Sequence, residues 1–320
     1  MITHVFITLA GVAFFSAALP AGAQQYPIKA VRVIVPFAPG GGSDLAARLV
    51  SQEMSKETGQ PFVIDNKPGA GGLVGTEILV KAPADGYTIM ISTSSWLTTA
   101  AISKPAFDPV NNIVPVIELG YNPLVLAVHP ALPVKTTLEF IALARARPGE
   151  LTYGQPGVGS ITDFGMILLE HMTKIKLVSI PYKSGGAVMP DLLSGRVPII
   201  MAGLVNVLQH AESGKLRILG VSTPKRIPEL PNVPPIADAL PGYAVTSWFG
   251  AVVPKGTPPA VVERLNVMLN KVLKNADMIR NANQQGMTIS GGSAEGMQRL
   301  VRTDYERWSK LAAAAKLKID

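Results

Sequence analysis

A short apolar strand that runs directly into three glycines constrains the fold of this chain more than any other feature. Arg32–Phe37 is apolar and β-branched, Gly40–Gly42 follow it, and an amphipathic segment begins at Leu45. Glycines let a backbone turn sharply and approach a ligand closely. A helix start, capped here by Ser43 or Asp44, adds unpaired N–H donors and a partial positive charge. This order predicts a cradle for a small anion that needs no catalytic side chain.

Similar glycine turns recur at Pro68–Gly72, Gly157–Ser160 and Ser184–Gly186. A single turn of this kind is often only a tight connection with a helix cap. Four of them, two in each half of the chain, favour a carboxylate held from both sides of a cleft.

The first residues resemble an export signal. Residues 1–28 contain no Lys, Arg, Asp or Glu, Val5–Phe15 are almost wholly apolar, and Ala21–Ala23 fit a small-x-small cleavage site. The apolar run of about 15 residues falls short of the ~20 that span a bilayer, which argues against a membrane anchor. We therefore expect residues 1–23 to be a signal peptide. Because the chain has no cysteine, we expect no disulfide and no lipoprotein anchor.

Strand-like and helical segments alternate along the rest of the chain, which predicts an α/β fold with mixed sheets flanked by helices. The length remaining after residue 23 favours two lobes. We expect residues 24–122 and 245–320 to form one lobe and residues 123–244 the other. The two crossings near Tyr121–Pro123 and Tyr243–Trp248 would then be the hinge, with a ligand cleft between the lobes.

The motifs of common enzymes do not occur. The sequence has no G-x-S-x-G elbow, no Walker A loop and no closely spaced histidine pair, and without cysteine there is no thiolate nucleophile. We expect no enzyme activity, no cofactor and no metal. The net charge of +7 indicates an anionic partner or, more simply, solubility. No basic stripe interleaved with aromatics appears, so we expect no nucleic acid partner.

The candidate ligand-binding residues come from the glycine turns and the strand ends next to them. They are Phe37, Pro39, Gly40, Gly41, Ser43, Asp44, Thr93, Trp96, Gly159, Ser160, Ile161, Thr162, Lys183, Ser184, Ala202 and Gly203. Trp96 is an equal candidate for the core, and Lys183 for a solvated surface lysine.

Motifs along the whole expected mature chain resemble the solute-binding proteins of tripartite tricarboxylate transporters, the TctC or Bug family. The matching segments are Tyr26–Pro27, Val33–Gly41 with Asp44, Asn66–Gly72, Asp85–Thr88, Phe107–Pro109, Gly159–Ser160, Pro181–Lys183, Asp191–Gly195, Gly214–Arg217, Trp248–Gly250, Pro254–Pro258 and Arg264–Asn266.

The resemblance implies a two-lobed, type II-like periplasmic binding protein fold. It also implies that the protein captures a small organic carboxylate and delivers it to the membrane permease subunits of the transporter. In that family, the loops matching Phe37–Asp44 and Gly157–Thr162 hold one carboxylate, largely through backbone amides. We expect a soluble periplasmic monomer with this role.

Three positions depart from the family pattern: Asp163 replaces a frequent histidine, Ala202-Gly203 replaces a frequent Asp-Asn pair, and Asn112 replaces an aspartate. With Trp96 as an apolar wall, Ala202 and Gly203 would favour an acid with an apolar or aromatic body over citrate. The alternative is that both residues pack inside the lobe. Two other functions stay open: a receptor that presents its ligand to a sensor, and an exported hydrolase.

The exported protein should begin at or near Gln24, because cleavage after Ala23 fits the signal pattern. N-terminal sequencing of the periplasmic fraction measures this directly. A membrane-bound product that retains Met1 would contradict it.

Overall fold

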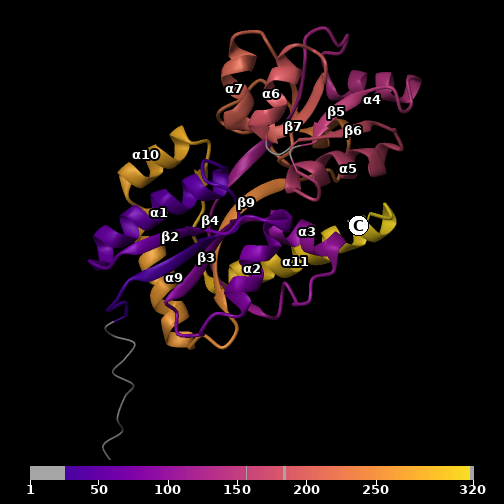
Figure 1. Ribbon diagram of the computed structural model, residues 1–320. Helices are drawn as coiled ribbons and strands as arrows, with labels where there is room; N and C mark the ends of the chain where they lie inside the picture. The colour runs from indigo at the N-terminus through magenta and orange to yellow at the C-terminus, as the bar shows by residue number, and fades with distance from the viewer. Residues whose placement is uncertain (1–25, 156, 183–184, 318–320) are drawn as a thin grey trace, which may run out of the picture.

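The computed structural model describes residues 26–155, 157–182 and 185–317, which form two α/β halves joined through a shared strand (Figure 1). The expected signal peptide, residues 1–23, lies outside the described residues. The two halves have the mixed sheets and flanking helices that the sequence predicts.

The first half combines the two ends of the chain. Its strands are β1 (Val31–Val35), β2 (Phe62–Asn66), β3 (Thr88–Thr93), β9 (Thr246–Pro254) and β10 (Thr288–Ile289). Its helices are α1 (Gly42–Thr58), a 3₁₀ turn η1 (Ala70–Gly72), α2 (Leu73–Val80), α3 (Ser95–Ser103), α9 (Pro259–Leu273), α10 (Ala276–Gln284) and α11 (Ala294–Ala314).

The second half is built from the middle of the chain. Its strands are β5 (Thr152–Gln155), β6 (Val178–Pro181), β7 (Ile199–Gly203) and β8 (Arg217–Val221). Its helices are α4 (Thr137–Ala146), α5 (Ile161–Thr173), α6 (Gly185–Leu193), α7 (Leu204–Glu212) and α8 (Ile236–Ala239).

Strand β4 (Ile113–Val128) belongs to both halves. It pairs antiparallel with β9 from Ile113 to Pro123, and then with β7 and β8 from Leu124 to Val128. The full strand order is β2-β1-β3-β9-β4-β7-β5-β6, with β10 and β8 also paired to β4. The sequence pattern indicates a strand only in the second part of β4, because Pro115, Gly120 and Pro123 interrupt the pattern before it. The change of partner at Pro123 makes β4 the central connection between the halves.

Alternating side chains of the first sheet fill two cores, because successive residues of a strand point to opposite faces. Val33 and Val35 face the helices α1, α9 and α10, whereas Ile34 faces α2, α3 and α11. In the second half, the side chains of β4 also alternate between two cores. Leu126 packs with α4 and α5, whereas Val125 packs with α6 and α7.

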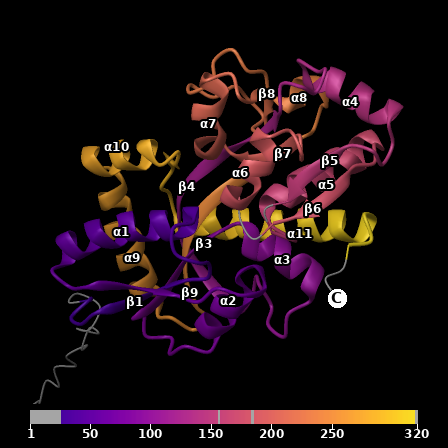
Figure 2. The same ribbon diagram turned by 45° about the horizontal axis from the view of Figure 1, so that its top comes forward.

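The long C-terminal helix α11 crosses from one half to the other (Figure 2). Met297 and Val301 pack in the first half, whereas Trp308 and Leu311 pack with residues of the second. The Trp308 ring meets the Phe164 ring edge-on, with centroids 5.7 Å apart. The last turns of α11 therefore pack with residues from the middle of the chain, although the sequence analysis assigned all of residues 245–320 to the other lobe.

No helix in the described ranges is both long enough and apolar enough to cross a membrane.

Replacing Trp308 should loosen the join between the halves. The side chain is 1% exposed, so Trp308→Ala should lower the free energy of unfolding by about 3–5 kcal/mol. Trp308→Phe keeps an aromatic ring against Phe164 and should cost less than half as much. Urea denaturation of both variants measures the difference, and equal losses would show that the ring contact contributes nothing.

Candidate functional site

The first glycine loop connects β1 to α1 and is exposed from Ala38 to Gly42. Gly40 takes a left-handed conformation with φ +83°. Its N–H donates to Oδ2 of Asp44 over 3.0 Å. The side chain of Asn66 donates both to Oδ1 of Asp44 over 2.9 Å and to the carbonyl of Phe37 over 3.1 Å. The loop is thus shaped by a buried carboxylate and an amide, both from its own half.

The charge of Asp44 is neutralised inside the protein. Its side chain is 2% exposed, and Nε of Arg48 lies 2.8 Å from Oδ2. Burial alone would raise the pKa of Asp44, but hydrogen bonds from Arg48, Gly40 and Asn66 lower it overall. A paired, ionised Asp44 therefore does not oppose an anion at the loop.

The start of α1 offers several free backbone donors. The first N–H groups of a helix have no acceptor within the helix. In the described part of the chain, the N–H groups of Gly41, Gly42, Ser43 and Asp44 have no hydrogen-bond partner. Gly41 has an ordinary φ of −80° and no side chain to cover them. The helix begins at Gly42 with Gly41 at its N-cap and no side-chain cap, so the expectation that Ser43 or Asp44 caps it is wrong.

The second glycine loop, between β5 and α5, repeats the construction. Gly159 has φ +75°, and its N–H donates to Oδ2 of Asp163, four residues later, over 2.9 Å. The hydroxyl of Tyr153 donates to Oδ1 of Asp163 over 3.3 Å. Both halves thus carry a Gly-x-x-x-Asp loop, and this spacing was visible in the sequence but was not recognised there.

The two aspartates differ in their surroundings. Asp163 is 3% exposed, and burial raises its pKa although Gln155, Gly159 and Tyr153 donate hydrogen bonds to it. No Lys, Arg or His forms an ion pair with Asp163 among the described residues. The second loop therefore holds a carboxylate without the cation that Asp44 has.

The second loop has few free donors, which corrects the expectation that Gly159–Thr162 offers a row of them. The N–H groups of Gly159, Ser160 and Ile161 donate to Asp163, the Gly157 carbonyl and Ser95, respectively. Thr162 alone of these four has an N–H without a partner in the described ranges. The hydroxyls of Ser160 and Thr162 lie 2.9 Å apart and bond to each other. The Ile161 side chain is in the hydrophobic core.

Trp96 does not line the cleft. It is 0% exposed and packs with Ile34, Leu79 and Trp248 in the core of the first half. The helix α3, which begins at Ser95, was not predicted and turns the indole inward. The expectation that Trp96 forms an apolar wall of the ligand cleft is therefore wrong.

Ala202 and Gly203 also lie away from a ligand-facing surface. Ala202 is 2% exposed and packs with Val188 and Leu192. A Cβ on Gly203 would meet the side-chain amide of Asn122 at 2.6 Å, so this glycine faces the crossing strand β4. The alternative that both residues pack inside the lobe is confirmed, and the argument for an apolar ligand loses this support.

The remaining candidates are placed as follows. Phe37 and Thr93 are half-buried at the ends of β1 and β3, Pro39 is exposed, and Ser43 is buried in the first turn of α1. Lys183 and Ser184 lie outside the described residues. The sequence missed Asn66 and Ser95, whose polar side chains position the two loops.

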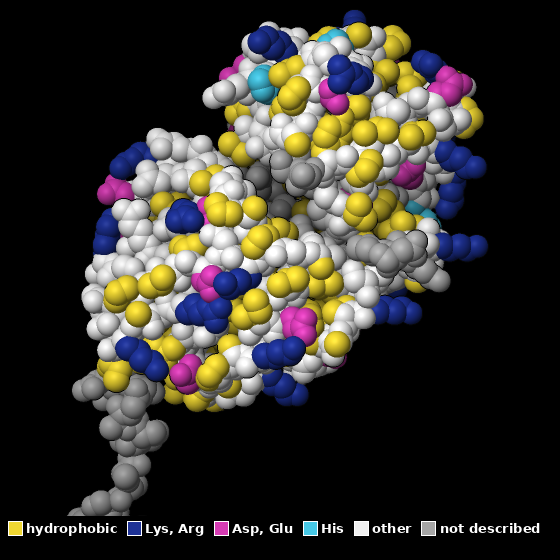
Figure 3. Space-filling view, viewed as in Figure 1, with side chains coloured by type: hydrophobic (Ala, Val, Ile, Leu, Met, Phe, Trp, Pro, Cys, Tyr) yellow, Lys and Arg dark blue, Asp and Glu magenta, His cyan; other side chains and the backbone are white. Residues whose placement is uncertain are grey.

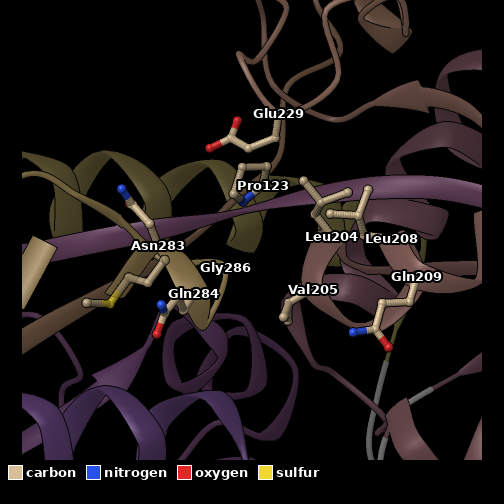
Figure 4. Close-up of a pocket in the computed structure, with 10 residues that line it drawn as sticks. Pro123, Leu204, Val205, Leu208, Gln209, Glu229, Asn283, Gln284 and Gly286 are labelled. Atoms are coloured by element: carbon tan, nitrogen blue, oxygen red, sulfur yellow. The ribbon is translucent and has the colours of Figure 1, made fainter. Parts of the chain in front are cut away.

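A hollow separates the two halves on the face shown in Figure 3. A cavity of about 160 Å³ lies between α7 and the end of α10 and has Pro123 of β4 in its wall (Figure 4). Its lining combines Leu204, Val205 and Leu208 with Asn283 and Gln284. None of the glycine-loop residues lines it, so this cavity is separate from the candidate anion site.

Two α/β halves joined by a crossing strand, with a glycine loop at a helix start in each half, are the architecture of a two-lobed solute-binding protein. Comparison with known proteins gives the family. Residues 46–317 match the model described as "Tripartite tricarboxylate transporter family receptor". The chain belongs to this family, whose members are periplasmic solute-binding receptors that bind small carboxylates and work with the membrane components of tripartite transporters.

Individual relatives match over almost the whole chain. Protein BugT of Bordetella pertussis is 33% identical over 98% of this chain and 97% of its own. An R. palustris protein solved with adipate is 36% identical, with a TM-score of 0.82, over 92% of this chain and 99% of that one. The protein MatC from Rhodopseudomonas palustris, solved with bound malate, is 29% identical, with a TM-score of 0.80, over 89% and 99%.

The contributions of the two loop aspartates to the free energy of unfolding should change in opposite directions as the pH falls. Asp44 has a lowered pKa, so its contribution to stability is present above its unfolded value of 3.8 and is lost as pH falls through the folded pKa. Asp163 has a raised pKa, so its ionisation costs stability that returns as pH falls toward 3.8. Between pH 7 and pH 3, wild type should lose stability relative to Asp44→Asn and gain it relative to Asp163→Asn. Urea denaturation at several pH values tests this. Free energies of unfolding that change equally with pH in wild type and both variants would contradict it.

Proposed function

We propose that this protein captures a small organic carboxylate in the cleft and delivers it to the permease subunits of a tripartite transporter. The observation that carries the proposal is the row of free N–H groups at the start of α1, which is exposed at Gly41 and Gly42 and lies beside an aspartate whose charge is already paired. Such a row binds a carboxylate through hydrogen bonds and the helix dipole. Relatives of known structure with adipate and malate support the same ligand class.

The ligand carboxylate binds chiefly to the first lobe. Gly41–Asp44 offer four free N–H groups, whereas Thr162 offers one from the second loop. The second lobe contributes this amide and the hydroxyls of Ser160 and Thr162, and it covers the ligand. Since Trp96, Ala202 and Gly203 are packed inside the lobes, we propose no preference for aromatic acids.

We further propose that the mature protein is a soluble periplasmic monomer without a lipid anchor, and that it has no enzyme activity. The signal pattern at residues 1–23 supports the periplasmic location, and the absence of cysteine supports the lack of a lipid anchor. Presentation of the ligand to a sensor would use the same cleft. Growth of a deletion strain on the identified acid as sole carbon source distinguishes transport from sensing.

A thermal-shift screen with adipate, malate, citrate and benzoate tests the ligand class. An acid present at a hundred times its dissociation constant adds about 2.7 kcal/mol to the free energy of unfolding. We expect adipate or malate to raise the melting temperature without being consumed. Hydrolysis of a carboxylic ester or amide, added to the protein in a separate assay, would favour a hydrolase.

Gly41→Val should then weaken binding of the best acid at least tenfold, because a side chain would block the approach to the free N–H groups. The substitution is compatible with the fold, since Gly41 has an ordinary φ and a Cβ would meet its nearest atom at 3.6 Å. Gly296→Val, in the first turn of α11, is the matched control and should bind as wild type does. Calorimetry measures both, and equal affinities would contradict this mode of binding.

A further inference from the structure

One face of α3 reaches from the first half of the molecule to the second glycine loop. Ser95, Thr98, Thr99 and Ile102 follow the i, i+3, i+4, i+7 spacing that places residues on one side of a helix. They are 7%, 0%, 1% and 8% exposed. Ile102 packs among core residues of the second half, including Ile161 and Phe164. This polar face is therefore buried between the halves.

Three hydrogen bonds join this face to the loop. The hydroxyls of Thr98 and Thr99 lie 2.6 Å and 3.3 Å from the carbonyl oxygen of Gly159. The N–H of Ile161 donates to the Ser95 hydroxyl over 3.2 Å. The Thr98 hydroxyl also lies 2.9 Å from the Ser95 carbonyl, but the bond to the other half is the shorter one.

Gly159 is held from both sides. Its N–H donates to Asp163 of its own half, while its carbonyl accepts from Thr98 of the other. A Cβ at Gly159 would come within 2.7 Å of the Ile102 side chain. The left-handed φ and this close approach both require glycine, so the loop and α3 fit together at one residue.

We propose that Asp163, Gly159 and Thr98 form a latch between the lobes that holds the loop 157–162 in the position from which it covers the ligand. Thr98 and Asp163 are positioning residues, and neither needs to touch the ligand. This inference rests on the proposed function and goes beyond it, because it assigns a role in ligand affinity to groups buried outside the anion site.

The latch affects affinity through the population of the closed arrangement. When only a fraction of the protein is competent to bind, the apparent dissociation constant equals the intrinsic constant divided by that fraction. Breaking the bond from Thr98 leaves the buried Gly159 carbonyl with the longer contact to Thr99 alone, and an underpaired buried carbonyl is costly. The lobes then separate more often, and each binding event must close them again.

Thr98→Val and Thr98→Ser separate the hydroxyl from the side-chain volume. Valine keeps the shape and removes the donor, whereas serine keeps the donor. With adipate as the probe in calorimetry, Thr98→Val should raise the dissociation constant about tenfold, and Thr98→Ser should restore it to within about twofold of wild type. Ser95→Ala, which removes the acceptor for Ile161, is a milder second variant and should raise the constant about fivefold.

A distance measurement tests the latch without any ligand. The chain has no cysteine, so Gln52→Cys on α1 and Ala142→Cys on α4, both exposed, accept spin labels selectively. The distance between the labels should lengthen or broaden in Thr98→Val and in Ser95→Ala but not in Thr98→Ser.

Unchanged distances and an unchanged dissociation constant in Thr98→Val and Ser95→Ala would overturn the latch. A lower melting temperature with unchanged distances would also overturn it, because the bonds would then be structural only. If wild type binds none of the acids in the panel, the proposed function fails, and the label distances still decide whether the latch exists.

Discussion

The candidate site depends on one repeated interaction, a buried aspartate that accepts a hydrogen bond from a glycine N–H four residues earlier. In each lobe this bond closes the turn between a strand and a helix and fixes where the remaining amides point. In the first lobe, Arg48 and Asn66 also donate hydrogen bonds to Asp44, and the N–H groups of Gly41–Asp44 stay free. In the second lobe, Tyr153 and Gln155 also donate to Asp163, and the amides of Gly159, Ser160 and Ile161 are occupied. The same turn thus serves binding in one lobe and contact between lobes in the other.

Much of the fold could be predicted from local pattern. The parallel strands β1 to β3 follow from short apolar runs, such as Arg32–Phe37, that are separated by helical segments. The first half of β4 could not be predicted, because its prolines and glycine are tolerated only where bulges and a change of partner occur. The helix α3 was missed because Thr98 and Thr99 donate their hydroxyls to Gly159 of the other lobe, which no local pattern shows.

The candidate site was predictable as a set of loops but not as a set of contacts. The glycine runs indicate where backbone approaches a ligand, and the resemblance to a family gives the ligand class. Neither tells which amides are already occupied, since Ile161 donates to Ser95, which lies 66 positions earlier. Nor does either tell that Trp96 and Ala202 turn inward, because an apolar residue beside a cleft and one beneath it look alike in sequence.

The first lobe is assembled from the two ends of the chain, and this arrangement governs when it can fold. Side chains of β1 and α1 share one core with α9 and α10, more than 200 positions later. A chain that emerges from the ribosome N-terminus first cannot complete this core until nearly all of it has been made. Contacts this distant in sequence also form slowly. The first lobe therefore closes only after the second lobe, whose strands and helices lie in the uninterrupted middle of the chain, has been made.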